Sequence, residues 1–447
     1  MSRSKILKVL YLAFGLRAVA SFVKAFWELI EPHTWRQTDT LGVSYRYFLR
    51  FTHEPFSFKL FLPAVLQSGD GNGILPMEFP LLNLVFAPLW AFGPYWGKVA
   101  IYILFAAFTF GVSFWLSRTK TWLAPCFLLL PFLSFSADYI EKFIPDTAAT
   151  LLVLLGLFEL LKVRKFRGQV LITLGLLVKP TAIIALATLF LFSKFRKKYV
   201  RYCLLLVPPV LVCGLYYTVG MKLIDHYRTG DLLIFAVSPR NPVDALTQIF
   251  SNPAFIYNQF QNRLFMAYGG LIFVAGLLIS RNLKIIKLGS LALLLMFLQF
   301  TAIAALDGAH SAQHDYYYMG ISPIAAASFY YLMRKGQALY SSFLLILLFG
   351  HACELAAQNL KREKIYGFYE SRRQCAELKV NHPEFPWDQD YTFRSRDEPY
   401  PSLGLCFGER QGSKLAQYGL FYLADPVPEH CEAVAHSSIY QLVKCAP

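Results

Sequence analysis

The sequence predicts an all-α, polytopic membrane protein with a small external C-terminal domain. Hydrophobic residues make up 56% of the 447 residues and charged residues only 16%, whereas soluble domains are about a quarter charged. The mean hydropathy is +0.42. The apolar residues are gathered in segments of membrane-spanning length, and the basic residues lie in short clusters between them. This pattern is typical of membrane helices joined by cytoplasmic loops.

The net charge of +15 has the same explanation. A nucleic-acid-binding protein would carry a basic face or a recognised binding motif, and the sequence shows neither. We therefore expect the membrane, and no nucleic acid, among the partners.

The first apolar segment, residues 6–28, has two interpretations. Ala18-Val19-Ala20 resembles a signal-peptidase site, which would make the segment a cleaved signal. Apolar residues continue to Ile30, however, and this favours an uncleaved first span.

Hydrophobic segments and basic clusters together predict the topology. A spanning helix needs about 20 apolar residues. Placing the N-terminus and every basic cluster in the cytoplasm gives about eleven crossings of the cell inner (plasma) membrane and a C-terminus on the external, periplasmic side. The candidate segments are 6–28, 98–117, 121–136, 147–161, 169–193, 202–219, 264–280, 288–305, 318–333 and 338–356.

Two segments depart from simple crossings. A crossing at 80–93 would place the basic cluster that begins at Arg118 outside, so this short, proline-containing stretch is predicted to be a helix in the membrane interface. Residues 169–193 have basic clusters at both ends, so they must enter and return as a short hairpin that turns near Lys179-Pro180.

The predicted domains are a membrane domain over residues 1–356 and an external domain over residues 357–447. Within the first, residues 29–97 form the first external loop, with juxtamembrane helices. Four cysteines outside the membrane predict two disulfides of open pairing: Cys375, Cys406, Cys431 and Cys445.

The candidate functional residues all map to the outer side or the outer half of the membrane. Carboxylates beside a lipid headgroup can activate an acceptor hydroxyl, and neighbouring Arg or Lys can hold a phosphate leaving group. The candidate functional residues are Arg36, Asp39 and Arg46 in the first loop, Glu78 before the interfacial helix, Glu141 and Asp146 before the fourth span, Lys179 at the hairpin turn, and His310, His314 and Asp315 before the tenth span.

These residues also have structural interpretations. Arg36 and Asp39 are spaced as an ordinary surface ion pair. Glu78 and Asp146 suit the N-termini of helices. Lys179, about ten residues into the bilayer, either faces a polar cavity or extends its ammonium to the interface.

Several motifs resemble glycosyltransferase family 39 of the GT-C class, which includes protein O-mannosyltransferases and the lipid A aminoarabinose transferase. They begin with residues 35–40, Trp-Arg-Gln-Thr-Asp-Thr, followed by Arg46 and Phe48. Residues 77–81, Pro145-Asp146, residues 177–180 and residues 314–317 match further landmarks in the same order. The resemblance covers roughly residues 10–335.

The resemblance implies an inverting transfer of a sugar from a polyprenyl-phosphate carrier to an acceptor lipid, glycan or protein on the external face. Asp39 would be the catalytic carboxylate, with Glu78 and Asp146 as supporting acidic residues. In relatives the residue matching Glu78 can bind a divalent metal, and His314 would be a further candidate ligand.

This chain departs from the family pattern at one phosphate contact. Phe79 stands where relatives have a lysine. Arg36, Arg46 and Lys179 are the available substitutes for binding the donor phosphate.

Two other classes of protein fit part of the pattern. A transporter or flippase of lipid-linked sugars would also be polytopic. It would be expected to show polar residues through the full membrane depth or repeat symmetry, and neither is visible in the sequence. A non-catalytic envelope assembly protein would leave the order of Asp39, Glu78, Asp146 and Lys179 unexplained.

Overall fold

The computed structural model describes most of the first half of the chain and scattered parts of the second. The described residues are 3–26, 34–63, 74, 77–119, 124–132, 139–162, 164–191 and 199–227, together with single positions and short stretches beyond residue 246 and four strands between residues 391 and 445.

The chain divides into two compact units. Unit 1 contains Met1–Phe22, Leu104–Leu215 and Val237–Gln358, and unit 2 contains Val23–Ile103, Tyr216–Ala236 and Asn359–Pro447. The predicted domain boundary after residue 356 stays a prediction.

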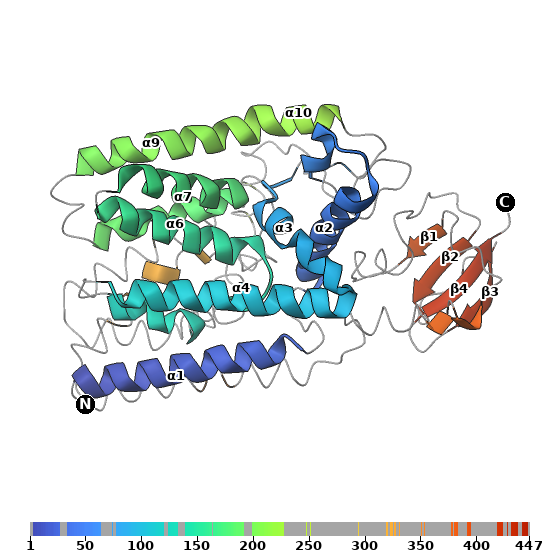
Figure 1. Ribbon diagram of the computed structural model, residues 1–447, viewed down its shortest axis with the longest axis horizontal. Helices are drawn as coiled ribbons and strands as arrows, with labels where there is room; N and C mark the ends of the chain where they lie inside the picture. The colour runs from blue at the N-terminus through green and yellow to red at the C-terminus, as the bar shows by residue number, and fades with distance from the viewer. Residues whose placement is uncertain are drawn as a thin grey trace. The chain divides into compact units, whose positions relative to one another are not determined.

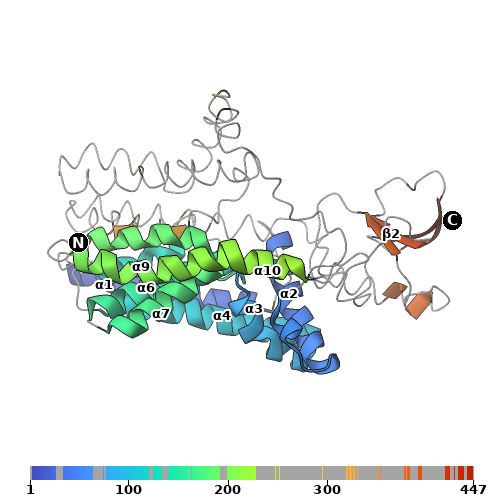
Figure 2. The same ribbon diagram turned by 90° about the horizontal axis from the view of Figure 1, so that it is seen from above.

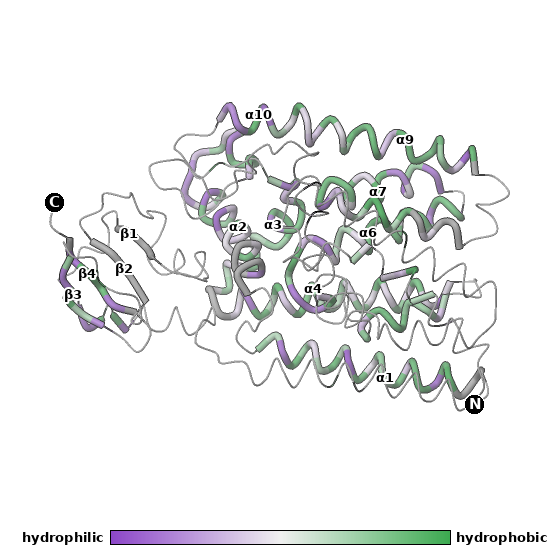
Figure 3. Tube along the Cα trace, turned by 180° about the vertical axis from the view of Figure 1, so that it is seen from behind, coloured by the Kyte–Doolittle hydropathy of each residue, from purple (hydrophilic) through white to green (hydrophobic). Residues whose placement is uncertain are grey.

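Three helices are long and apolar enough to cross a membrane: Ile6–Lys24, Trp96–Ser117 and Val200–His226. They lie in α1 (Arg3–Lys24), in α4 (Pro94–Ser117) and in the continuous run formed by α9 (Tyr199–Leu215), the π-helix η5 (Tyr216–Gly220) and α10 (Met221–His226). Hydrophobic residues predominate along α4 and α9 (Figure 3). The described helices therefore support a predominantly helical membrane protein, and the count of about eleven crossings stays a prediction.

Within unit 1, α1 has an inner and an outer face. Ile6, Leu10 and Phe14 are buried at helical spacing, and the ring of Phe14 packs edge-on against Phe110 of α4 at 5.3 Å. Leu12 and Leu16 on the other side are exposed, as expected for residues that face lipid.

The third candidate span is longer than the sequence predicts. The predicted segment ends at residue 219, but helical structure continues to His226. Pro208 and Pro209 lie inside α9 without ending it.

Unit 1 contains a packed group formed by α6 (Pro145–Leu161), α7 (Lys165–Val178), η4 (Pro180–Leu191) and α9. Helices α6 and α7 are joined by a short connection and pack along each other, and α9 packs against α7 (Figures 1 and 2). Cys213 of α9 donates to the Leu176 carbonyl at 3.5 Å, and Gln169 donates to the Leu205 carbonyl at 3.1 Å.

The chain changes direction at Lys179, where the predicted turn is present. Lys179 has extended backbone angles (φ −156°, ψ 113°) and is the C-cap of α7, and η4 begins at the next residue. The 3-10 helix η4 contacts both α6 and α7. A collinear continuation of α7 would extend past the N-terminal end of α6, so these contacts indicate that η4 folds back.

Glycines bring α6 and α7 into close contact. A Cβ atom on Gly156 would lie 2.7 Å from the Gly168 carbonyl oxygen, and one on Gly175 would lie 2.8 Å from the Ala149 carbonyl oxygen. Small residues that let backbones approach are a common means of association between membrane helices. Gly168 and Gly175 are one heptad apart, which places both on the same face of α7.

Unit 2 contains the first-loop helices. Helix α2 (Thr34–His53) packs against α3 (Leu81–Phe86) and the 3-10 helix η2 (Ala87–Phe92). The apolar stretch Leu81–Phe92 is too short to span a membrane, which agrees with the predicted juxtamembrane helix. Gly93, with φ of 81°, ends this stretch before α4 begins.

A four-stranded sheet lies within the C-terminal region, in the order β1-β2-β4-β3. Strands β1 (Tyr391–Arg394) and β2 (Tyr418–Tyr422) are parallel, whereas β4 (Tyr440–Cys445) is antiparallel to both β2 and β3 (Cys431–His436). Cys431 is disulfide-bonded. Four cysteines among the described residues are free thiols: Cys126, Cys203, Cys213 and Cys353.

The close contact between α6 and α7 predicts a specific sensitivity to added volume. Gly168→Ala should lower the free energy of unfolding by about 1–3 kcal/mol, because the new methyl group would lie 2.8 Å from the Gly156 carbonyl oxygen. Gly111→Ala in α4 is the matched control, since nothing lies within 4 Å of its Cβ position. Denaturant titration in detergent measures both, and equal stability of the two variants would contradict the packing argument.

Candidate functional site

The first-loop motif lies on helix α2. Arg36 and Asp39 occupy its first two turns, and their spacing of three places them on one face of the helix. Their side chains lie outside the described part of the structure.

The residues around Asp39 form a buried polar seam between α2 and its neighbours. Gln37, Thr40 and Ser44 are all buried. The Tyr102 hydroxyl of α4 donates to Gln37 at 2.7 Å. These polar contacts require α2 to hold one rotation about its axis, which fixes the backbone that carries Asp39.

Further hydrogen bonds attach α2 to α3 and η2. The Asn83 amide donates to the Thr40 carbonyl at 2.7 Å, and the Ser44 hydroxyl donates to the Asn83 carbonyl at 3.1 Å. The Trp90 indole donates to the Ser44 hydroxyl at 3.2 Å. Asn83 therefore connects two successive turns of α2 to α3.

Lys98 is a buried charge that the sequence reasoning did not single out. It is among the most deeply buried large side chains of the described residues, and it lies one turn before Tyr102 on α4. The sequence signal that could have identified Lys98 is a lysine at the N-terminal edge of an apolar segment, on the side of the membrane where the acidic motif is predicted to lie.

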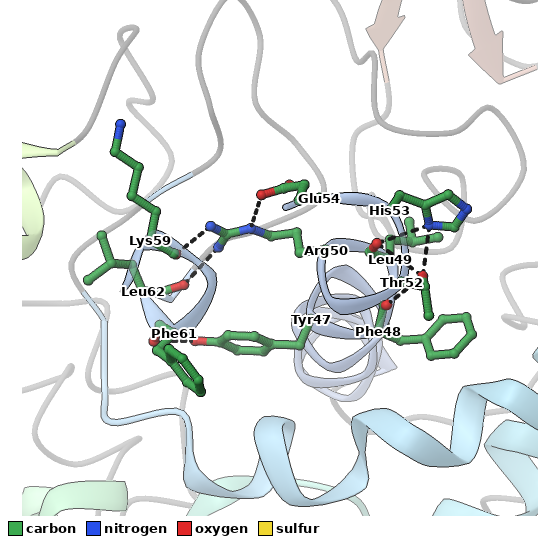
Figure 4. A network of polar contacts seen from close by, with 10 residues as sticks. All are labelled: Tyr47, Phe48, Leu49, Arg50, Thr52, His53, Glu54, Lys59, Phe61 and Leu62. Atoms are coloured by element: carbon green, nitrogen blue, oxygen red, sulfur yellow. Dashed lines mark hydrogen bonds and ion pairs between the residues drawn. The ribbon is translucent and has the colours of Figure 1, made fainter. Parts of the chain in front are cut away.

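Arg46 is buried in α2. Arg50, one turn later, lies at the centre of a network of polar contacts (Figure 4). The Arg50 guanidinium donates to the Leu62 carbonyl at 3.0 Å and also to the Lys59 carbonyl, and it pairs with Glu54 at 3.3 Å. Arg50 therefore has a structural role, because its hydrogen bonds stabilise the turn that follows α2.

Tyr47 contributes to the same turn. Its hydroxyl donates to the Phe61 carbonyl at 3.2 Å. Burial raises the pKa of the Tyr47 phenol, and the Arg50 guanidinium opposes this shift more weakly. The phenol therefore stays protonated and remains a donor at physiological pH.

Glu78 lies half-buried in a short segment held by Tyr216. The Tyr216 hydroxyl donates to the Met77 carbonyl at 3.0 Å, and the Phe79 ring packs edge-on against the Tyr216 ring at 5.6 Å. The backbone on both sides of Glu78 is thus fixed by one residue of the π-helix η5. Phe79, which stands where the proteins that this chain resembles have a lysine, has a packing role here.

Asp146 belongs to unit 1 and lies in the first turn of α6. Ile144 is the N-cap and Pro145 the first helical residue, so Asp146 is placed where a carboxylate is favoured by the helix dipole. It is buried, and the adjacent Thr147 hydroxyl donates to the Tyr139 carbonyl at 2.8 Å. The helix dipole is one physical reason for a carboxylate at this position, and the part of Asp146 in a functional site stays a prediction.

Glu141 forms a buried ion pair within unit 1. The Arg17 guanidinium of α1 and the Ser21 hydroxyl one turn later each donate to Glu141 Oε2 at 2.5 Å. Arg17 and Glu141 expose only 15% and 10% of their side chains. Arg17 thus has a partner in the loop before α6, which explains a charge in the middle of the first span.

Lys179 is buried at the reversal between α7 and η4. Lys179 belongs to unit 1, whereas the first-loop residues belong to unit 2. His310, His314 and Asp315 lie outside the described residues. Among the residues that the structure describes, no group of three or more His, Cys, Asp or Glu side chains is placed to hold a metal ion.

Comparison of the chain with protein-family models, with curated proteins and with solved structures finds no match.

The Arg17–Glu141 pair predicts a large effect of removing one partner. Arg17→Met should lower the free energy of unfolding by about 3–5 kcal/mol, because it leaves the Glu141 carboxylate buried without its guanidinium. The double variant Arg17→Met/Glu141→Gln should recover part of this loss.

Arg164→Met is the matched control, because Arg164 pairs with Glu159 at 3.3 Å but exposes 57% of its side chain. It should change the free energy of unfolding by about 0–1 kcal/mol. Denaturant titration in detergent measures all three variants, and an equal effect of the two single substitutions would contradict a buried pair.

Proposed function

We propose that this protein is a membrane glycosyltransferase that moves a sugar from a polyprenyl-phosphate-linked donor to an acceptor hydroxyl on the external face of the plasma membrane, with inversion at the anomeric carbon. The proposal rests on the motif resemblance and on one structural observation. The helix that carries Arg36 and Asp39 is held by a buried hydrogen-bonded seam.

That seam matters because catalytic groups need a fixed geometry. Gln37 and Thr40, which flank Asp39, both hydrogen-bond to neighbouring helices. A carboxylate on a helix fixed in this way suits general-base catalysis better than one on an open loop. A helix used only as a docking surface would not require its polar residues to be buried.

The chemistry assigned to Asp39 is proton transfer. Its carboxylate accepts the proton of the acceptor hydroxyl while the hydroxyl oxygen bonds to the anomeric carbon. The bond from that carbon to the donor phosphate oxygen breaks at the same time, and polyprenyl phosphate leaves with the electron pair. Attack opposite the leaving group inverts the anomeric configuration.

Cationic residues would stabilise the phosphate that leaves. Arg36, Arg46 and Lys179 are assigned this role, and Glu78 and Asp146 are assigned as supporting acidic residues. Arg46 and Lys179 are both buried, and a charge removed from water interacts with a phosphate more strongly than an exposed one. In the same proposal, Glu78 and His314 would hold a divalent metal ion, which would bind the donor phosphate and neutralise its charge.

Asp39→Asn tests the general base. This near-isosteric change removes the proton acceptor, and we expect transfer to fall by roughly 10²–10⁴-fold while protein abundance and melting stay unchanged. The measurement is mass spectrometry of envelope lipids, glycans and proteins from a deletion strain that expresses either form of the protein.

Glu432→Gln, an exposed change in β3, is the control and should support wild-type transfer. A deletion strain with unchanged envelope glycosylation would contradict the function itself. Asp39→Asn activity within about threefold of wild type would leave the function standing and remove Asp39 from the mechanism.

Lys179→Met distinguishes a phosphate contact from a structural charge. Loss of a phosphate contact should raise the donor concentration needed for half-maximal transfer and leave thermal unfolding in detergent unchanged. A structural ion pair should instead lose about 3–5 kcal/mol of stability. Unchanged melting together with unchanged donor dependence would contradict both roles.

A further inference from the structure

The turn that follows helix α2, residues 54–62, presents phenylalanine rings to the outside. Phe56 is 87% exposed, Phe58 is 68% exposed and Phe61 is 46% exposed. We call residues 54–62 the aromatic turn. Three exposed phenylalanines within six residues form an apolar patch that a water-facing loop would not be expected to carry.

The aromatic turn is held in a defined shape. Arg50 donates to two of its carbonyl groups and pairs with Glu54 at its start, and the Tyr47 hydroxyl donates to the Phe61 carbonyl (Figure 4). The rings also contact one another, since Phe56 packs edge-on against Phe61 at 6.2 Å. The exposure of the rings is therefore a property of an ordered turn.

The end of the turn is attached to a candidate membrane span. Leu62 is buried in one cluster with Ile74 and Ile224, and Tyr216 packs against this cluster. Ile224 and Tyr216 belong to the last turns of Val200–His226. Because Leu62 packs against Ile224 at the end of a candidate spanning helix, the phenylalanines just before Leu62 would lie near the level at which that helix leaves the membrane.

Exposed apolar residues continue on that same helix. Val219 and Leu223 are 52% and 60% exposed, as expected for side chains that face lipid. The aromatic turn adds aromatic rings and the exposed Lys59 next to the end of this surface. Phenylalanine side chains with a nearby lysine are found in segments that lie in the membrane interface, where the apolar rings reach the acyl boundary and the ammonium stays at the lipid phosphates.

We propose that the aromatic turn docks into the external leaflet of the membrane, with Phe56, Phe58 and Phe61 among the lipid headgroups and upper acyl chains and with Lys59 at the phosphates. The partner is the lipid surface itself. This proposal depends on the membrane location and is independent of sugar transfer.

A photocrosslinker at Phe58 tests the docking directly. The full-length protein, with p-benzoylphenylalanine in place of Phe58, is reconstituted into vesicles of phosphatidylethanolamine and phosphatidylglycerol and irradiated. Mass spectrometry then measures the fraction of the Phe58 peptide that carries a phospholipid. Because Phe58 is exposed, the larger ring should not disturb folding.

Two other positions calibrate the result. The same crosslinker at Leu223, on the exposed side of α10, should label lipid, and at Val434, exposed on β3, it should not. We expect the lipid adduct at Phe58 to approach that at Leu223 and to exceed that at Val434 by about tenfold or more. A yield at the level of Val434, or a crosslink to protein instead of lipid, would overturn the proposal.

Discussion

Polar side chains that are withdrawn from water determine how the helices of this chain pack. In a bilayer a buried charge or hydroxyl must find its partner within the protein, because the surrounding lipid offers none. Arg17 and Ser21 of α1 both donate to Glu141, so this helix is fixed in its rotation about its axis. In unit 2 the pairs Tyr102–Gln37 and Trp90–Ser44 have the same effect on α2.

Close backbone contact is the second means of packing. Apolar side chains gain little by leaving lipid for another apolar surface, so membrane helices depend on fit. The glycines of α6 and α7 let the two backbones approach until no methyl group would fit between them. A rigid pair of this kind gives Lys179, at the end of α7, a fixed position despite its extended backbone.

Much of the helical architecture could be predicted from the sequence because hydrophobic length and basic flanks are local signals. The short apolar helical stretch Leu81–Phe92 and the turn at Lys179 were both predictable from prolines and charge. The partner of Glu141 was not, because Arg17 lies more than a hundred residues away in the chain and no periodicity connects them. Lys98 and Arg50 were missed because a single charge at a helix edge usually means a solvated residue.

The π-helix at Tyr216–Gly220 has a consequence for how this chain tolerates insertions and deletions. A π-helical turn holds one residue more than an α-helical turn, so everything after it is rotated by about 100° relative to a regular helix. This rotation lets Tyr216 hold residues 77–79 while Ile224, farther along, packs against Leu62. Loss of one residue here would restore a regular helix of nearly the same length and hydrophobicity, yet it would turn Ile224 away from its neighbours. The spacing between Tyr216 and Ile224 is thus under tighter constraint than the identity of the lipid-facing residues between them.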